Sequence, residues 1–353
     1  MKGGLDTLVL RLTNRCNLAC GYCYAGSGPA GEDLSPERAA EAVDLACPPG
    51  GALRIQFTGG EPLLRWDTAA KVLDFGRASG RRFHAAIQTN GTLLTPALCR
   101  ELRARRVAVG VSLDGVGPDN AARRTPEGEP SFQATARGLQ TLAAAGMAAN
   151  LTAVVSAGSV RGLDRLLDFA LWCGNVHGVG LDLVRPQGRG AGAEGLNRLL
   201  ARHDQLARLG RPVRLKELER LRLLLRTGCR RDCYCNAQTG RSLAVTPDGR
   251  LWPCSALAGA EGCLLGTLGA GTALPQSPCP GLEPPECARC PAFGLCGGGC
   301  PAARRAGPSP LDCQMHRRML EHACRLEGKL EWWNTWKTAF PDREEPDDKE
   351  ESQ

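Results

Sequence analysis

The first half of the chain repeats one pattern, in which a short β-rich run is followed by a stretch with helical periodicity. The six β-rich runs are Thr7–Leu12, Leu53–Thr58, Phe83–Thr89, Val107–Leu113, Ala148–Val155 and Val179–Val184. Helix-initiating residues lie between them, such as Ser35 before Pro36 and Thr95 before Pro96. Strands that alternate with helices form parallel sheets with right-handed crossovers. Because six units fall short of the eight that close a barrel, the pattern predicts an α/β fold with an open, partial TIM-like (β/α)6 barrel.

The overall composition is that of a soluble globular protein. Of 353 residues, 42% are hydrophobic and 23% are charged, which excludes wholesale disorder, a collagen-like chain and a membrane bundle. No run approaches the roughly 18 apolar residues that a membrane-spanning helix needs. Asp6 and Arg11 interrupt any apolar core of a signal peptide. We therefore expect a cytoplasmic protein with no membrane partner.

The chain has 18 cysteines, and they are unevenly placed. Three lie near the N-terminus, and twelve fall between Cys229 and Cys324. In a reducing compartment thiols serve metal binding or catalysis more often than disulfides. The clustering therefore predicts bound metal.

The three early cysteines, Cys16, Cys20 and Cys23, follow the first predicted strand. Three thiolates can hold three irons of a 4Fe–4S cluster and leave the fourth iron without a protein ligand. Such an open position is what a catalytic metal site requires. A zinc loop is the alternative, but it needs a fourth ligand nearby, and the nearest histidine is His84.

With this loop the sequence resembles the radical S-adenosylmethionine (SAM) superfamily, including Tyr22 before the third cysteine. After the second strand, Gly59-Gly60-Glu61-Pro62 resembles the GGEP segment of that family, whose backbone holds the amino group of SAM. Two glycines permit close approach of the backbone, and proline favours an extended residue before it. The resemblance implies reductive cleavage of SAM to a 5′-deoxyadenosyl radical, which abstracts hydrogen from a substrate.

Four further positions belong to the same resemblance. It places Ser112 and Arg124 around the ribose and carboxylate of SAM. It implies that Asn90 and Asp114 order the same rim of the barrel. The alternative for the last two is that Asn90-Gly91 and Asp114-Gly115 are only turns.

The C-terminal half resembles the SPASM domain, which carries auxiliary 4Fe–4S clusters in radical SAM enzymes that modify peptides. By this resemblance, the cluster nearer to the barrel would be bound by Cys229, Cys235, Cys254 and Cys300. Cys233 is a rival for Cys229 in this set. The farther cluster would be bound by Cys287, Cys290, Cys296 and Cys313. We therefore expect three 4Fe–4S clusters and SAM as cofactors, with two zinc ions as the alternative for this region.

These features divide the chain into five predicted parts. They are a radical SAM partial barrel at 1–190, bridging helices at 191–228, a SPASM domain at 229–325, a C-terminal helix at 326–340 and a disordered polar tail at 341–353. The glycine-rich run around residues 187–195 marks the first boundary.

The net charge of +7 suggests an acidic partner such as nucleic acid. The expected clusters change that sum, because a 4Fe–4S cluster with four thiolates carries about −2 and one with three carries about −1. With two of the former and one of the latter, the charge falls to about +2. We therefore expect no nucleic-acid partner.

Most SPASM enzymes act on ribosomally made peptides, so the resemblance predicts a thioether or carbon–carbon crosslink in a precursor peptide. Anaerobic sulfatase maturases carry a basic aspartate directly after the second SPASM cysteine, whereas this chain has Ser255 there. Sulfatase maturation is therefore less favoured. The alternatives are a dehydrogenase of a protein side chain or small molecule and, more distantly, a non-enzymatic iron–sulfur electron carrier.

The expected partners are a precursor peptide and a flavodoxin- or ferredoxin-type reductant. Leader recognition would come from a separate small protein, or else from the bridging helices and the tail. No general base stands out in the sequence. The five histidines belong to no motif, and structural or surface roles are expected for them: His84, His177, His203, His316 and His322.

Overall fold

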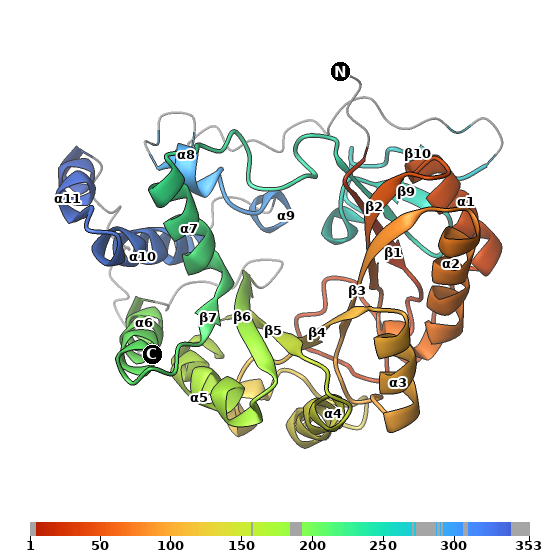
Figure 1. Ribbon diagram of the computed structural model, residues 1–353, viewed down its shortest axis with the longest axis horizontal. Coiled ribbons are helices and arrows are strands. Elements are labelled where there is room, and N and C mark those ends of the chain that lie inside the picture. The colour runs from red at the N-terminus through yellow and green to blue at the C-terminus, as the bar shows by residue number, and fades with distance from the viewer. Residues whose placement is uncertain are drawn as a thin grey trace, which may run out of the picture.

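The computed structural model describes residues 5–156, 158–183, 193–269, 272, 287, 290, 292–305 and 310–339. Six parallel strands form the first half: β1 (Thr7–Arg11), β2 (Ala52–Thr58), β3 (Arg82–Thr89), β4 (Ala108–Ser112), β5 (Ala149–Val155) and β6 (Val176–Leu183). They confirm the six strands predicted from the sequence. In Figure 1 they follow one another around an open arc, as a partial barrel requires.

Five helices alternate with these strands: α1 (Pro36–Ala46), α2 (Trp66–Ala78), α3 (Pro96–Ala104), α4 (Phe132–Ala144) and α5 (Leu163–Cys173). They lie on the outer side of the arc (Figure 1). Ser35 caps α1 by accepting a hydrogen bond from the backbone N–H of Arg38, and Thr95 caps α3 in the same way through Leu98. The fully buried Phe57 and Leu10 come from the strands beneath, so the core is formed where helices cover the sheet.

The sheet continues beyond these six strands at both edges. β7 (Arg214–Leu215) pairs in parallel with β6, and β8 (Ser242–Val245) pairs in parallel with β1. β9 (Arg250–Trp252) and β10 (Gly266–Thr267) extend the second edge as antiparallel strands, which gives a ten-stranded sheet. The cysteine-rich half therefore begins as a direct extension of the barrel sheet.

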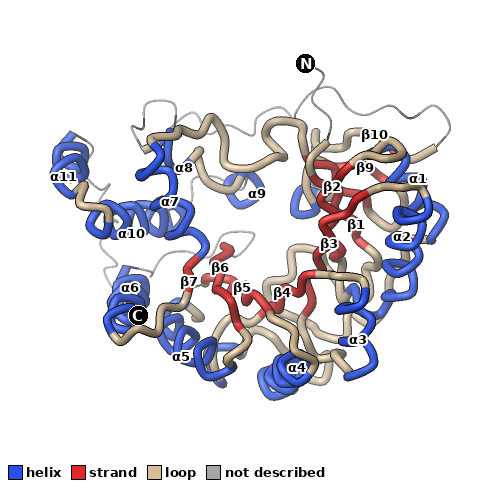
Figure 2. Tube along the Cα trace, in the orientation of Figure 1, coloured by secondary structure: helices blue, strands red, loops and turns tan. Residues whose placement is uncertain are grey.

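Six further α-helices follow in the described part of the chain: α6 (Ala193–Arg208), α7 (Lys216–Thr227), α8 (Phe293–Cys296), α9 (Pro301–Arg304), α10 (Pro310–Leu326) and α11 (Leu330–Ala339). α10 packs against both α6 and α7 (Figure 2). The predicted C-terminal helix at 326–340 overlaps α11, and the chain between α10 and α11 turns near Gly328, which has a positive φ of 67°.

Within the described residues, no helix combines the length and apolarity needed to cross a membrane. The predicted tail at 341–353 and most of the predicted glycine-rich boundary lie outside the described residues. The division into five domains stays a prediction.

Candidate active site at the carboxyl ends of the strands

The loop that follows β1 carries the three predicted cluster ligands, Cys16, Cys20 and Cys23. Its backbone is fixed at two points: the N–H of Cys16 donates to the carbonyl of Gly28 at 2.6 Å, and the N–H of Ala19 donates to that of Arg124 at 2.7 Å. The pKa of Cys16 is raised to about 11, mainly by burial, and the neighbouring thiols of Cys20 and Cys23 contribute to the rise. The structure thus brings the three thiols together in one shielded environment.

An anchor at Asp33 holds the start of this loop to the segment that follows β2. The carboxylate of Asp33 accepts hydrogen bonds from the hydroxyl of Thr13 and the guanidinium of Arg15, each at 2.6 Å. Arg65, at the end of the short 3-10 helix η1 (Pro62–Arg65), donates to the same carboxylate at 2.6 Å. These hydrogen bonds outweigh the effect of burial and lower the pKa of Asp33. The loop is therefore tied to the segment that follows β2.

Gly59 and Gly60 lie directly against the cysteine loop. The N–H of Gly60 donates to the carbonyl of Thr13, and the N–H of Glu61 donates to that of Arg15, both at 2.8 Å. A Cβ on Gly59 would overlap the backbone of Thr13, and one on Gly60 would overlap the carbonyl oxygen of Arg15. The two glycines are required because two backbones meet here without room for a side chain.

Glu61 is fully buried and joins the ends of β2 and β3. Its Oε1 accepts from the hydroxyl of Thr89 at 2.7 Å and from the N–H of Leu63 at 3.0 Å. Its Oε2 accepts from the N–H of Asn90 at 2.8 Å. Burial raises the pKa of Glu61 to about 6, although these donors favour the charged form. The side chain of this predicted cofactor residue is therefore held by the protein itself, and Pro62 next to it starts η1.

Asn90 reaches from the end of β3 to the cysteine loop. Its Nδ2 donates to the Oδ1 of Asn17 at 2.9 Å and, at 4.0 Å, to the sulfur of Cys16. Its Oδ1 accepts from the N–H and the hydroxyl of Thr92 at 2.9 and 2.7 Å. Asn90 thus forms a turn and contacts a predicted cluster ligand at the same time.

Tyr22, Asp114 and Arg123 form a buried group beside Cys20. The hydroxyl of Tyr22 donates to Oδ2 of Asp114, and Nε of Arg123 lies 3.0 Å from Oδ1 of the same carboxylate. The guanidinium of Arg123 stacks over the Tyr22 ring at 5.6 Å from its centroid. Burial raises the pKa of Tyr22 and of Cys20, and the cation of Arg123 opposes the rise at the thiol.

The structure separates two adjacent arginines that the sequence does not distinguish. Arg124, the predicted SAM contact, has an exposed side chain, and its carbonyl accepts from Ala19. Arg123 is buried against Asp114 and was missed by the sequence analysis. Ser112, at the end of β4, accepts a hydrogen bond from Nε2 of Gln88 at 2.8 Å and lies half-buried on the same rim.

Comparison with known proteins shows which family the chain belongs to. The sequence profile of the Radical SAM superfamily matches residues 10–165. An uncharacterized protein of Methanocaldococcus jannaschii is 30% identical over 267 residues, which cover 73% of this chain and 88% of that protein. The chain belongs to the radical SAM superfamily.

Two further comparisons extend over nearly all of this radical SAM protein. The serine-type anaerobic sulfatase-maturating enzyme of Klebsiella aerogenes is 26% identical over 358 residues, covering 92% of this chain and 87% of the enzyme. The solved structure of native anSMEcpe with bound AdoMet and Kp18Cys peptide has a TM-score of 0.74 at 20% identity and covers 93% of this chain and 99% of that one. The latter similarity shows that the fold is shared over 93% of this chain.

The donor set of the loop fits the 4Fe–4S cluster that radical SAM proteins use. The four sulfurs around one zinc ion lie about 4 Å apart, given a Zn–S distance of about 2.3 Å. In the described part of the chain, no three cysteines have sulfur atoms within 4.8 Å of one another. The thiols of Cys16, Cys20 and Cys23 are neighbours but lie farther apart than the sulfurs around a single zinc ion. This wider spacing suits a cluster of several metal ions.

In the cysteine-rich half, Arg304 of α9 links two members of the predicted farther set. Its guanidinium donates to the sulfur of Cys287 at 3.5 Å and to that of Cys313 at 3.3 Å. Burial raises the pKa of Cys296 to about 12, and the nearby Cys313 contributes to the rise. The backbone N–H of Cys290 donates to the carbonyl of Cys287 at 3.0 Å. The four residues of this set are therefore close neighbours in the fold.

The cysteines of the predicted nearer cluster are not all shown to be neighbours. Burial raises the pKa of Cys235, and Cys300 and Cys233 both add to the rise, so these three thiols lie in one environment. Cys254 follows β9, where its sulfur accepts from the N–H of Ala256 at 3.2 Å. Cys229 is exposed, whereas Cys233 is half-buried. These positions favour Cys233 over Cys229 as the remaining ligand, and the assignment of the set stays a prediction.

Proposed function

We propose that this protein is a peptide-modifying radical SAM enzyme that installs a thioether or carbon–carbon crosslink in a ribosomally made precursor peptide. The loops after β1, β2, β3 and β4, which are neighbours in the sheet, bring the cysteine trio, Gly59-Gly60, Asn90 and Ser112 to one rim. This convergence is the observation that carries the proposal, because the carboxyl ends of parallel strands are where such barrels bind their reactants.

Residues of this rim would each have a defined task. The cysteine trio would hold a 4Fe–4S cluster, which supplies the electron that cleaves SAM into a hydrogen-abstracting radical. The N–H groups of Gly60 and Glu61 are already paired with the cysteine loop. The segment therefore offers a ligand its carbonyl oxygens, which accept hydrogen bonds from an ammonium group such as that of SAM.

The buried group of Tyr22, Asp114 and Arg123 would position the loop rather than react. It places a cation next to Cys20 while its own charges are compensated inside the protein. Such compensation keeps the rim polar without admitting water. Protection from water and from stray hydrogen donors is what radical chemistry requires of the protein.

We further propose that the cysteine-rich half holds two auxiliary 4Fe–4S clusters that carry electrons. Four cysteine ligands to each cluster would leave no iron free to bind substrate. A substrate radical loses an electron when it closes a new bond, and these clusters would accept it. An external flavodoxin- or ferredoxin-type protein would supply the first electron, and a reducing cytosol would suit so many free thiols.

A second candidate, oxidation of a protein side chain, is favoured by the near full-length similarity to the Klebsiella aerogenes sulfatase-maturating enzyme. Against it stands Ser255, the first residue of the 3-10 helix η4 (Ser255–Leu257), because the resemblance described above implies a basic aspartate at this position in such enzymes. A serine hydroxyl is not a base near neutral pH. Crosslinking therefore remains the preferred proposal.

Mass spectrometry of a coexpressed peptide tests the proposal. The chain is expressed anaerobically with the short open reading frame beside its gene, and the peptide is analysed by fragmentation. Loss of two hydrogens with missing fragments between two linked residues is expected. Cys20→Ala should abolish the change, whereas Cys173→Ala, a half-buried cysteine on α5 outside the site, should retain it. A complete fragment ladder with an aldehyde would instead establish side-chain oxidation.

A further inference from the structure

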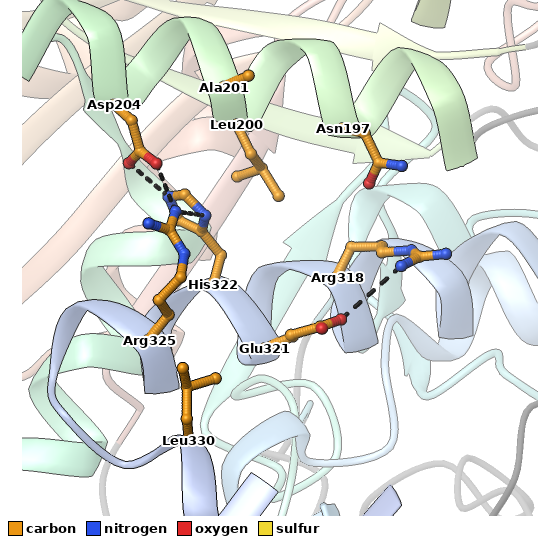
Figure 3. A pocket seen from close by; sticks show the side chains of 9 residues that line it. All are labelled: Asn197, Leu200, Ala201, Asp204, Arg318, Glu321, His322, Arg325 and Leu330. Atoms are coloured by element: carbon orange, nitrogen blue, oxygen red, sulfur yellow. Dashed lines mark hydrogen bonds and ion pairs between the residues drawn. The ribbon is translucent and has the colours of Figure 1, made fainter. Parts of the chain in front are cut away.

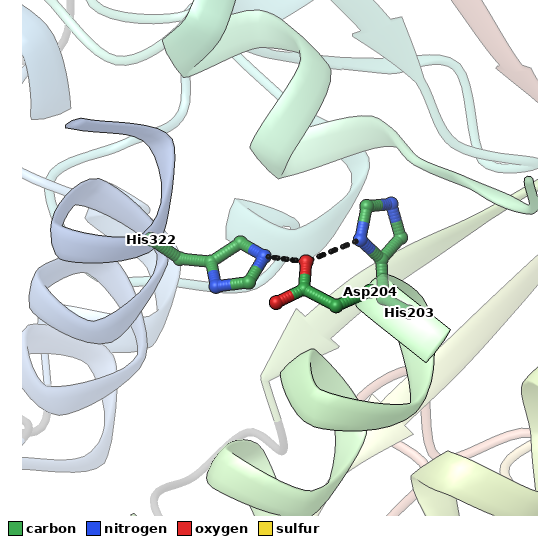
Figure 4. Close-up of side chains that lie close together, drawn as sticks. All are labelled: His203, Asp204 and His322. Atoms are coloured by element: carbon green, nitrogen blue, oxygen red, sulfur yellow. Dashed lines mark ion pairs between the residues drawn. The ribbon is translucent and has the colours of Figure 1, made fainter. Parts of the chain in front are cut away.

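Two buried histidines and one aspartate meet between α6 and α10, far along the chain from the rim. His203 and Asp204 belong to α6, and His322 belongs to α10. Among the described residues, these three form the one group of metal-binding side chain types whose ligand atoms all lie within 4.8 Å of one another. Figure 4 shows both rings turned toward the carboxylate of Asp204.

The ring nitrogens that face the carboxylate make ion-pair contacts with it but no well-aligned hydrogen bond. Nε2 of His322 lies 3.1 Å and Nδ1 of His203 lies 3.8 Å from the same oxygen, Oδ1 of Asp204. Neither nitrogen has a hydrogen-bond partner of acceptable geometry, although His203 is only 5% exposed and His322 only 6%. Buried polar atoms normally find a partner, so two such atoms aimed at one point call for an explanation.

We propose that His203, Asp204 and His322 bind a divalent metal ion of the zinc class. Two imidazoles and one carboxylate are a ligand set that zinc accepts, with a fourth position left for water or another small ligand. The ion would connect α6 to α10 and so join the bridging region to the C-terminal helices. The site is independent of the iron–sulfur chemistry and does not rest on the proposed function.

The protonation of the ligands agrees with this geometry. Burial lowers the pKa of both histidines, to about 4 for His322, so both imidazoles are neutral near pH 7 and can donate a lone pair. Arg325 lies beside the group: its guanidinium contacts Oδ2 of Asp204 and donates to Nδ1 of His322 at 2.8 Å.

Metal binding through Nε2 of His322 moves the ring proton to Nδ1, so the hydrogen bond from Arg325 to that nitrogen must be given up. The side chain of Arg325 is 46% exposed and has room to move. It can keep its contact with Oδ2 of Asp204 while Oδ1 binds the ion, which is a common second contact for a metal-bound carboxylate.

A pocket gives access to the site. It has a volume of about 300 Å³ and opens beside Asp204 and His322, between α6, α10 and the start of α11 (Figure 3). Arg318 and Glu321 form part of its wall, so it is polar enough for water. The fourth coordination position is expected to face this pocket.

The cysteines complicate a test, because they also bind zinc. The experiment therefore uses anaerobic protein whose iron–sulfur clusters have been reconstituted. Zinc is added, unbound metal is removed, and bound zinc is measured by mass spectrometry of the metal. One equivalent is expected in the wild type and in His177→Asn, which alters an exposed histidine of β6. His322→Asn and Asp204→Asn should each weaken binding by at least about tenfold.

The absorption spectrum of bound Co²⁺ provides a second measurement, because it reports the ligand atoms of the metal directly and does not depend on how a substitution affects folding. Bound at this site, Co²⁺ should show the weak absorption of nitrogen and oxygen ligation without thiolate charge-transfer bands. Arg325→Gln should still bind one equivalent of zinc, because it leaves all three proposed ligands in place, and it is the control that alters the site without removing a ligand. Equal zinc in all variants, no zinc in the wild type, or thiolate bands from cobalt would overturn the proposal.

Discussion

At the scale of single residues, the rim depends on charged groups that are buried together with their partners. Asp114 is almost completely buried and is compensated by Arg123 and Tyr22. Glu61 is likewise buried and accepts three hydrogen bonds from residues around it. Removal of one partner would leave the other charge or donor group uncompensated.

Arg123→Met is expected to destabilise the protein by about 3–5 kcal/mol, because it leaves the carboxylate of Asp114 buried without its cation. Arg124→Met is the matched control, since its side chain is exposed and its backbone contact to Ala19 is retained. The control should change stability by no more than about 0.5 kcal/mol. Anaerobic denaturation by urea measures both, and equal effects would contradict the roles assigned to the two arginines.

The raised pKa of Glu61 predicts a specific pH dependence of the stability of the protein. Its pKa is about 6 in the folded protein, compared with 4.5 for a free glutamate. Between these values the folded state binds more protons than the unfolded state, so its stability falls as pH rises, by about 2 kcal/mol in total. Glu61→Gln removes this contribution. The free energy of unfolding of the wild type minus that of the variant should therefore fall by about 2 kcal/mol as pH rises from below 4.5 to above 6, and stay constant at higher pH. A difference that does not change with pH would refute this.

The sequence predicted some of these residues and not others, for a physical reason. Cys16 and Gly60 belong to local motifs whose spacing reflects the chemistry directly. Arg123 and Arg124 are adjacent and chemically identical, and only the path of the chain decides which is buried. His203 and His322 lie on different helices, so no local pattern connects them.

At the scale of elements, the close contact between the segment after β2 and the cysteine loop after β1 holds the candidate active site in place. The segment after β2 contacts the cysteine loop through backbone alone, because Gly59 and Gly60 have no side chains. The loop is then held from the other side by the anchor at Asp33. The cysteines are thus positioned by neighbouring segments as well as by their own sequence.

Gly60→Ala is expected to displace the cysteine loop, because the added Cβ would overlap the carbonyl oxygen of Arg15. Iron bound after reconstitution should fall by at least about one third if the N-terminal cluster is lost and the two auxiliary clusters remain. Gly28→Ala is the control in the same loop, since nothing lies within 4 Å of its added Cβ. Unchanged iron in Gly60→Ala would show that the close approach does not matter.

The elements themselves were predictable to different degrees. β1 to β6 were evident from their β-rich runs between helical patterns. β7 and β10 have two residues each and β9 has three, which is too short for a periodic pattern. Such strands form only because a neighbouring strand already offers its edge, so their existence depends on the tertiary fold.

At the scale of the whole molecule, one sheet and one helical layer connect the two halves of the chain. β8 of the cysteine-rich half pairs with β1, the strand that leads into the cysteine loop. α10 packs against α7, and Glu327 accepts from Arg222 and Arg226 of α7 at 2.7 Å each. The C-terminal helices are therefore attached to the bridging region by specific contacts.

Glu327→Gln should loosen this attachment. The hydrogen bond from Arg226 is the main cause that lowers the pKa of Glu327 to about 2, so its contribution is present above pH 4.5 and is lost toward pH 2. After screening by solvent we expect a loss of about 1 kcal/mol at pH 7. Glu219→Gln, which pairs with Arg222 within α7 only, should cost less. Thermal unfolding compares the two, and a larger effect of the control would contradict the attachment.

The central claim is that Cys16, Cys20 and Cys23 hold a 4Fe–4S cluster with one iron free for SAM. Its most direct test is the formation of 5′-deoxyadenosine from SAM by anaerobically reconstituted protein reduced with dithionite. We predict that the wild type and Cys173→Ala form the nucleoside and that replacement of the three loop cysteines by alanine abolishes it. Protein that retains only zinc, or that never cleaves SAM when reduced, would contradict the account.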